Sequence, residues 1–309
     1  MKNVALALAS GGPRGFAYIG AIEELLSRGY TITSISGTSA GSLVGGIYAA
    51  GGMQAFKEWL FGLDPVKVMS LMDFSFSKNH LVKGDKVIKA IKERVPDVNI
   101  EDLPIPFCAV ATDLFTGEEV VFREGPLFDA IRASISIPSM FRPVKWKGRT
   151  LVDGGMVNTF PLNRVQRTPG DLLVGFNVNQ IDAAEIQGFL DSRAALVEGR
   201  EDLSLLGRLG KDLQEWRLNS MGKESRLPVN ADDNFASILQ RSFGIMNCTI
   251  ARMGIGLCKP DILVDLPFDS YHGVYGYTHA PEIVERGRSL MAEALDSFEL
   301  TSGCPSQCP

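Results

Sequence analysis

The sequence predicts an α/β protein: a three-layer α/β/α arrangement around a mostly parallel central sheet. Continuous apolar runs, typical of strands buried on both faces, occur at residues 4–9, 172–178 and 262–266. Segments with apolar residues at helical spacing lie between them, as at residues 16–28. Alternation of strands with helices favours βαβ units, and therefore parallel strand pairs.

Composition limits the class of protein. With 309 residues, of which 45% are hydrophobic and 22% charged, the chain is long enough to bury a sizeable core. We expect a single domain over residues 1–300, a charged amphipathic helical insertion at about 181–235, and a disordered tail at 301–309. The formal net charge of −5 argues against a nucleic-acid-binding surface.

The cysteines and the N-terminal segment bear on location. Five scattered cysteines, an odd number, are typical of reduced thiols in a cytoplasm. The apolar run at residues 4–9 is shorter than a signal peptide requires and leads into a glycine turn, so we interpret it as the first buried strand. No apolar stretch is long enough to predict a transmembrane helix.

A glycine-rich turn follows the first strand, with the sequence Ser10-Gly-Gly-Pro-Arg-Gly15. A turn that opens a helix presents free N–H groups to an anion, and the donors here are the amides of Gly11, Gly12, Arg14 and Gly15. A nucleotide phosphate loop is disfavoured, because Ser10 interrupts the G-x-G-x-x-G pattern. A purely structural turn is the remaining alternative.

The second strand, expected at residues 31–36, leads into Gly37-Thr-Ser-Ala-Gly41 and then a helix at 42–50. This is a G-x-S-x-G elbow, in which a sharp strand-to-helix turn exposes the serine hydroxyl. Ser39 is therefore a candidate nucleophile, which needs a base for its proton and donors for the oxyanion.

The middle of the chain supplies further elements and an acid. Residues 53–82 are rich in Met and Phe, which favours core packing; any exposed part of them is our candidate for an acyl-chain funnel. Asp113 is interpreted as a turn residue, whereas Asp153, which ends a strand and precedes two glycines, is a candidate catalytic carboxylate. The other expected helices cover 84–94, 127–134, 236–253 and 281–295, and the other strands 105–112, 120–122, 140–144 and 151–155.

Together, Ser10 to Gly15, Gly37 to Gly41 and Asp153-Gly-Gly155 resemble, in order, the three signatures of the patatin-like phospholipase family. The resemblance implies a lipid acyl hydrolase with a Ser39–Asp153 dyad and an oxyanion hole at the glycine turn, provided by Gly11, Gly12 and Arg14. It implies a lipid or acyl-ester substrate, no cofactor and no metal, and it leaves peripheral contact with a membrane open. The departure is Ser10, where the family usually has glycine.

Two other functions remain open on the residues alone. An ordinary α/β-hydrolase triad would combine Ser39 and Asp153 with His272 or His279, which follow Asp153 in the chain. A non-catalytic lipid-binding protein could keep the same fold, although the presence of both Ser39 and Asp153 disfavours it.

Overall fold

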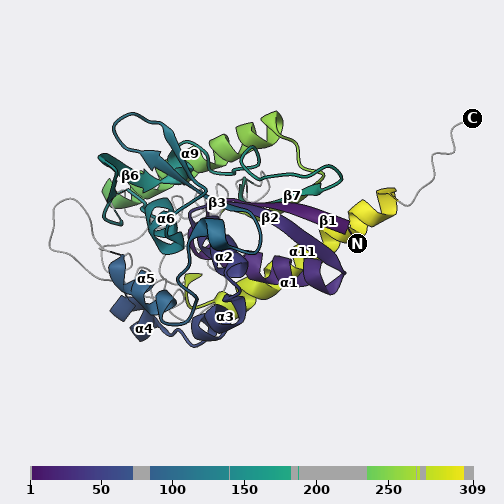
Figure 1. Ribbon diagram of the computed structural model, residues 1–309, viewed down its shortest axis with the longest axis horizontal. Helices are drawn as coiled ribbons and strands as arrows, with labels where there is room; N and C mark the ends of the chain where they lie inside the picture. The colour runs from purple at the N-terminus through teal and green to yellow at the C-terminus, as the bar shows by residue number, and fades with distance from the viewer. Residues whose placement is uncertain are drawn as a thin grey trace, which may run out of the picture.

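The computed structural model describes residues 2–71, 84–138, 140–181, 187, 235–268, 270–271 and 276–302. One sheet of eight strands forms its centre, in the order β5-β6-β3-β2-β1-β7-β8, with β4 pairing to the side of β3. Helices cover both faces of this sheet, and Figure 1 views it nearly edge on, with α9 on one face and α1, α2 and α11 on the other. The predicted fold class is confirmed.

The sheet combines a parallel centre with an antiparallel end. The strands β1, β2, β3, β7 and β8 pair in parallel, whereas β4, β5 and β6 form antiparallel pairs. The strand bounds are β1 Lys2–Leu8, β2 Tyr30–Thr38, β3 Phe107–Asp113, β4 Glu119–Phe122, β5 Val144–Trp146, β6 Arg149–Asp153, β7 Leu172–Gln180 and β8 Ile262–Pro267.

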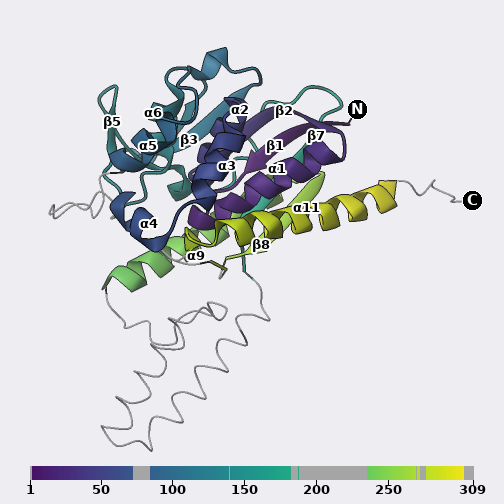
Figure 2. The ribbon, with the colours of Figure 1, turned by 90° about the horizontal axis from the view of Figure 1, so that it is seen from below.

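The helices connect the strands and pack on them. In Figure 2, α1 and α11 run side by side over one face of the sheet. The α-helices are α1 Ala17–Ser27, α2 Ala40–Ala49, α3 Met53–Phe61, α4 Pro65–Leu71, α5 Asp85–Lys92, α6 Leu127–Ser134, α9 Phe235–Leu257 and α11 Ala280–Ser302, and the 3-10 helices are η1 Gly12–Phe16, η2 Ile100–Asp102 and η3 Gly154–Met156. None of these helices has both the length and the apolar character needed to cross a bilayer.

The first strand shows how the sequence divides the core. Leu6 and Leu8 join the large cluster under α1, α2 and α11, whereas Ala7 and Ala9 join a smaller cluster with Ala251 of α9. Side chains alternate between the two faces of a strand. The small alanines therefore let α9 approach its face of the sheet closely.

Most predicted elements are confirmed within a few residues, and two boundaries were wrong. The strand expected at 140–144 begins only at Val144, because Pro143 has no N–H to give to a ladder. Helix α11 extends to Ser302, into the segment expected to be tail. Most of the expected insertion, at 182–186 and 188–234, lies outside the described residues, as do residues 303–309.

The strand register brings the candidate site together. Thr38, at the end of β2, pairs with Val110 of β3, and the next residue of β3, Ala111, pairs with Asp153 of β6. Because β6 runs antiparallel to β3, its last residue reaches the level of Ser39 from beyond the carboxyl edge of the sheet. Two segments far apart in the sequence thus end at the same point.

Candidate active site

The turn between β2 and α2 places Ser39 in an unusual backbone conformation, with φ 54° and ψ −119°. A residue other than glycine with positive φ is strained, and such strain is typical of functional sites. Both flanking glycines are required by contact. A methyl group on Gly37 would lie 2.4 Å from the carbonyl carbon of Gly41, and one on Gly41 would lie 2.2 Å from the carbonyl oxygen of Leu8. The predicted elbow is therefore present, and its sharp turn needs both glycines.

A second serine holds the elbow in place. The backbone N–H of Ser39 donates to Ser134 Oγ at 2.8 Å, and Ser134 Oγ donates to the carbonyl of Val110 at 2.6 Å. Ser134 is the last residue of α6 and is fully buried. This contact ties the Ser39 backbone to β3, and no pattern in the sequence predicted it.

The side chains of Ser39 and Asp153 are in direct contact. Ser39 Oγ donates to Asp153 Oδ2 at 2.5 Å, and the other carboxyl oxygen accepts from the Gly155 N–H at 2.7 Å. Ser39 is 2% exposed and Asp153 is 0% exposed, so the expectation of an exposed serine hydroxyl was wrong: the neighbouring segments cover the elbow. The hydroxyl and the carboxylate thus share a hydrogen bond in a site that largely excludes water, which strengthens electrostatic interactions.

Burial changes the acidity of this carboxyl group. It raises the pKa of Asp153 to about 7, and the hydrogen bonds from Ser39 and Gly155 oppose that rise. A carboxylate with a pKa near neutral pH is a stronger base than an ordinary aspartate and is well matched to general base catalysis. The arrangement can therefore remove a proton from a hydroxyl group.

The glycine turn lies next to the elbow. A methyl group on Gly15 would be 2.5 Å from Ala40 Cβ, so η1 packs directly against the start of α2. The first amides of a helix have no partner inside it, and η1 begins at Gly12, directly after Gly11. The Arg14 side chain has a structural contact: its guanidinium donates to the carbonyls of Val178 and Phe268, at 3.0 and 2.7 Å. Any anion-binding donor from Arg14 would thus be its amide.

Polar residues from later segments surround the Asp153 turn. Thr159 Oγ1 donates to the Gly155 carbonyl at 2.9 Å and lies 3.3 Å from Asn247 Oδ1. Asn247, which is buried, comes from α9. An asparagine within an apolar helical pattern is the signal in the sequence that could have drawn attention to it.

The structure describes one of the two histidines of the triad alternative. His279 directly precedes α11, where its N–H donates to the Gly276 carbonyl and its carbonyl accepts from Ile283. His272 lies outside the described residues. The contact of Ser39 Oγ with Asp153 itself matches a dyad rather than a chain in which a histidine separates serine from acid. Asp113 is the last residue of β3 and begins the turn that follows, as predicted: its Oδ1 accepts from the Phe115 N–H.

Comparison with known proteins agrees with these features. The patatin-like phospholipase family model matches residues 6–165, which include the glycine turn, Ser39 and Asp153. An uncharacterized NTE family protein of Mycobacterium tuberculosis is 32% identical, with the match covering 96% of this chain and 92% of that protein. A patatin-like phospholipase domain-containing protein of Caenorhabditis elegans is 30% identical over 62% of this chain and 15% of its own length, and patatin-like phospholipase domain-containing protein 6 of Mus musculus is 27% identical over 62% and 14%. The chain belongs to the patatin-like phospholipase family.

Proposed function

We propose that this protein is a lipid acyl hydrolase that cleaves carboxylic esters through an acyl intermediate on Ser39. The observation that carries the proposal is the 2.5 Å contact between Ser39 Oγ and Asp153 Oδ2 at a strained strand-to-helix elbow. A serine hydroxyl is a weak nucleophile unless a base removes its proton. The direct contact of Ser39 Oγ with Asp153 supports Asp153 as that base.

The proposed reaction has two halves. Asp153 takes the Ser39 proton as Oγ attacks the ester carbonyl carbon, and it then passes the proton to the departing alcohol. Water next attacks the acyl carbon while Asp153 accepts a proton from it. The bond between that carbon and Ser39 Oγ then breaks, and Asp153 passes the proton to Oγ, which releases the fatty acid and restores the Ser39 hydroxyl. The amides of Gly11, Gly12 and Arg14 are the proposed donors to the oxyanion of each tetrahedral intermediate.

Family membership supports a lipid substrate, and the surface supports a place for acyl chains. In the described part of the Met- and Phe-rich stretch, Val66 and Met69 of α4 are 78% and 47% exposed. Exposed apolar side chains of this kind favour contact with acyl chains or a membrane surface. Residues 72–82 of the same stretch lie outside the described residues.

The alternatives make different demands on Ser39. A Ser39/Asp153/histidine triad would also form an acyl-serine but would need His272 or His279, whereas a non-catalytic lipid-binding protein would form no acyl-serine. The direct Ser39–Asp153 contact favours the dyad over the triad.

The experiment is covalent labelling of the purified protein with a fluorophosphonate, followed by mass spectrometry of the labelled peptide and assay with p-nitrophenyl esters and phospholipid vesicles. We expect labelling at Ser39 and release of free fatty acid. Ser39→Ala should lose both. Tyr30→Phe, which removes another hydroxyl that hydrogen-bonds a carboxylate, is the matched control and should keep both. Ester turnover that persists in Ser39→Ala, with no label on Ser39 in the parent, would contradict the proposal.

A further inference from the structure

A row of amide and carboxyl groups crosses the carboxyl edge of the sheet and ends at the glycine turn. Asn177 Nδ2 donates to Asp265 Oδ1 of β8 at 2.7 Å, and Asn177 Oδ1 accepts from the Asn179 N–H at 3.1 Å. Asn179 Nδ2 then donates to the carbonyl oxygen of Ser10 at 2.7 Å. The row therefore connects β8 and β7 to the residue that immediately precedes Gly11.

The orientation of the Asn179 amide is determined by its surroundings. Its Nδ2 faces two acceptors, the Ser10 carbonyl at 2.7 Å and Asn177 Oδ1 at 3.5 Å. Turned over, the side chain would place its own oxygen against both acceptors, which is unfavourable. Its Oδ1 is buried and, within the part of the chain that the structure describes, has no hydrogen-bond partner; Asn179 is 3% exposed. The Asn179 side chain therefore acts through its Nδ2 donor.

The donor fixes the direction of a peptide plane. The Ser10–Gly11 peptide is trans, so its N–H points opposite to its C=O. The carbonyl of Ser10 is bonded by Asn179 of β7, and β1 lies between β7 and β2. The N–H of Gly11 is therefore directed away from β7, toward the side on which β2 ends at Ser39.

The two glycines lower the cost of rotating the Ser10–Gly11 peptide plane. Gly12 has φ 56°, a conformation that costs little only without a side chain. A methyl group on Gly11 would lie 2.0 Å from Val178 Cγ2, so the position has no room for one. A Gly-Gly pair that lacked an anchor could rotate the Ser10–Gly11 peptide and point its carbonyl, instead of its N–H, at the site.

We propose that Asn179 is a positioning residue that locks the Ser10–Gly11 peptide with the Gly11 N–H directed at the oxyanion. The inference rests on the proposed function, in which the Gly11 amide is an oxyanion donor. Asn179 touches neither the nucleophile nor the base, and it acts through the carbonyl of Ser10.

The test compares two substrates that differ at one atom, a p-nitrophenyl ester and its thionoester, in which the carbonyl oxygen is sulfur. An oriented N–H donor stabilises a developing oxyanion far better than a thiolate-like sulfur, so the ratio of the two rates reports the oxyanion hole. In Asn179→Leu, which has a similar shape and no donor, kcat for the ester should fall toward the ~10²–10³-fold typical of losing one oxyanion donor. The ratio of the ester rate to the thionoester rate should fall together with kcat for the ester, and KM should change by less than about threefold.

Thr33→Val is the matched control. Thr33 Oγ1 donates to the Val4 carbonyl at 3.1 Å, so it anchors the same strand, β1, near its other end. This variant should lose some thermal stability and keep the parental rate ratio. If Asn179→Leu does not fold, Asn179→Ala, which also lacks the donor, takes its place in the same two assays.

The outcomes separate the two proposals. A parent that is labelled on Ser39 and hydrolyses esters, together with an Asn179 variant whose oxygen-to-sulfur ratio is unchanged, would overturn this inference and leave the proposed function intact. An equal loss of rate on the ester and the thionoester would assign Asn179 a merely structural role and would also overturn this inference. A parent with no label on Ser39 and no ester turnover would overturn both.

Discussion

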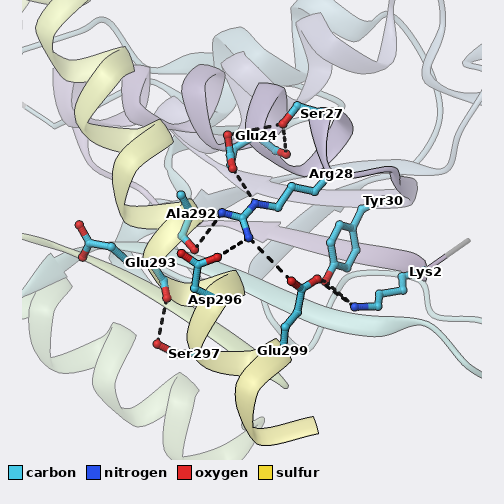
Figure 3. Close-up of polar contacts among 10 residues, drawn as sticks. All are labelled: Lys2, Glu24, Ser27, Arg28, Tyr30, Ala292, Glu293, Asp296, Ser297 and Glu299. Atoms are coloured by element: carbon cyan, nitrogen blue, oxygen red, sulfur yellow. Dashed lines mark hydrogen bonds and ion pairs between the residues drawn. The ribbon is translucent and has the colours of Figure 1, made fainter. Parts of the chain in front are cut away.

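Two carboxylates at opposite edges of the same sheet each accept a hydrogen bond from a hydroxyl group. At the carboxyl edge, Asp153 accepts from Ser39 at 2.5 Å. At the amino edge, Glu299 of α11 accepts from Tyr30 at 3.0 Å and from Lys2 at 3.0 Å, and Arg28 lies beside it (Figure 3). Both contacts thus join the same kinds of group, a carboxyl group and a hydroxyl group.

Their surroundings make them different acids. Asp153 is fully buried and, among the described residues, forms no ion pair, so burial raises its pKa to about 7. The Glu299 side chain is 41% exposed, and hydrogen bonds, first of all from Lys2, lower its pKa. The comparison teaches that water exclusion, rather than the hydroxyl partner, makes an acid into a base useful near neutral pH.

The largest expected effect is on stability at the buried site. The folded chain keeps a proton on Asp153 up to about pH 7, whereas the unfolded chain releases it near pH ~3.9. The parent should therefore lose stability as pH rises between these values, and Asp153→Asn, which does not titrate, should not. The difference in the free energy of unfolding, variant minus parent, should therefore increase by a few kcal/mol between pH 4 and pH 8. Urea denaturation across this range measures it; a constant difference would mean that the Asp153 pKa is not raised.

The next effect concerns rate. Because the ionised form of Asp153 is the proposed base, kcat/KM should rise about tenfold per pH unit below the Asp153 pKa of about 7 and level off above it. At pH 5 the rate should thus be roughly 100-fold below the plateau. The measurement is the pH profile with a soluble p-nitrophenyl ester. A profile already flat from pH 5 upward would show that the comparison between the two carboxylates is wrong.

The smallest effect is expected at the amino edge. Glu299→Gln removes an exposed ion pair with Lys2, and such pairs contribute little and are screened by salt. The melting temperature at pH 7 should fall by no more than about 3 °C. The pH dependence of stability is opposite in sign to that of Asp153. Because the pKa of Glu299 is lowered in the folded chain, its contacts stabilise the fold at neutral pH, and this stabilisation is lost as the pH falls through the Glu299 pKa. Adding 0.5 M salt, roughly five times the concentration that gives a ~10 Å screening length, should weaken any effect of this ion pair. A large fall in melting temperature that this salt does not change would contradict the prediction.

The sequence predicted the parts of the site that are local in the chain. The elbow at Ser39, the glycine turn and the strand that ends at Asp153 each depend on neighbouring residues, so their patterns are visible in the sequence. The structure places Ser39 and Asp153 in contact, although they are 114 positions apart.

The supporting contacts could not be predicted in this way. Ser134 reaches Ser39 from 95 positions away, and Asn179 reaches Ser10 from 169. Both contacts depend on which strands are neighbours and on their register, and neither leaves a periodic pattern in the chain. The antiparallel direction of β6, which brings Asp153 to the level of Ser39, was also beyond what its five residues reveal.

The central claim is that Asp153 itself takes the Ser39 proton and that no histidine takes part. Comparison of kcat/KM for Asp153→Asn with that of the double variant His272→Ala/His279→Ala tests it most directly, with circular dichroism to verify that both proteins fold. We predict that Asp153→Asn loses at least ~10³-fold in kcat/KM, because an amide cannot accept the proton, and that the double variant stays within about tenfold of the parent, a change of less than ~1.4 kcal/mol in the barrier. An inactive double variant beside an active Asp153→Asn would contradict the account.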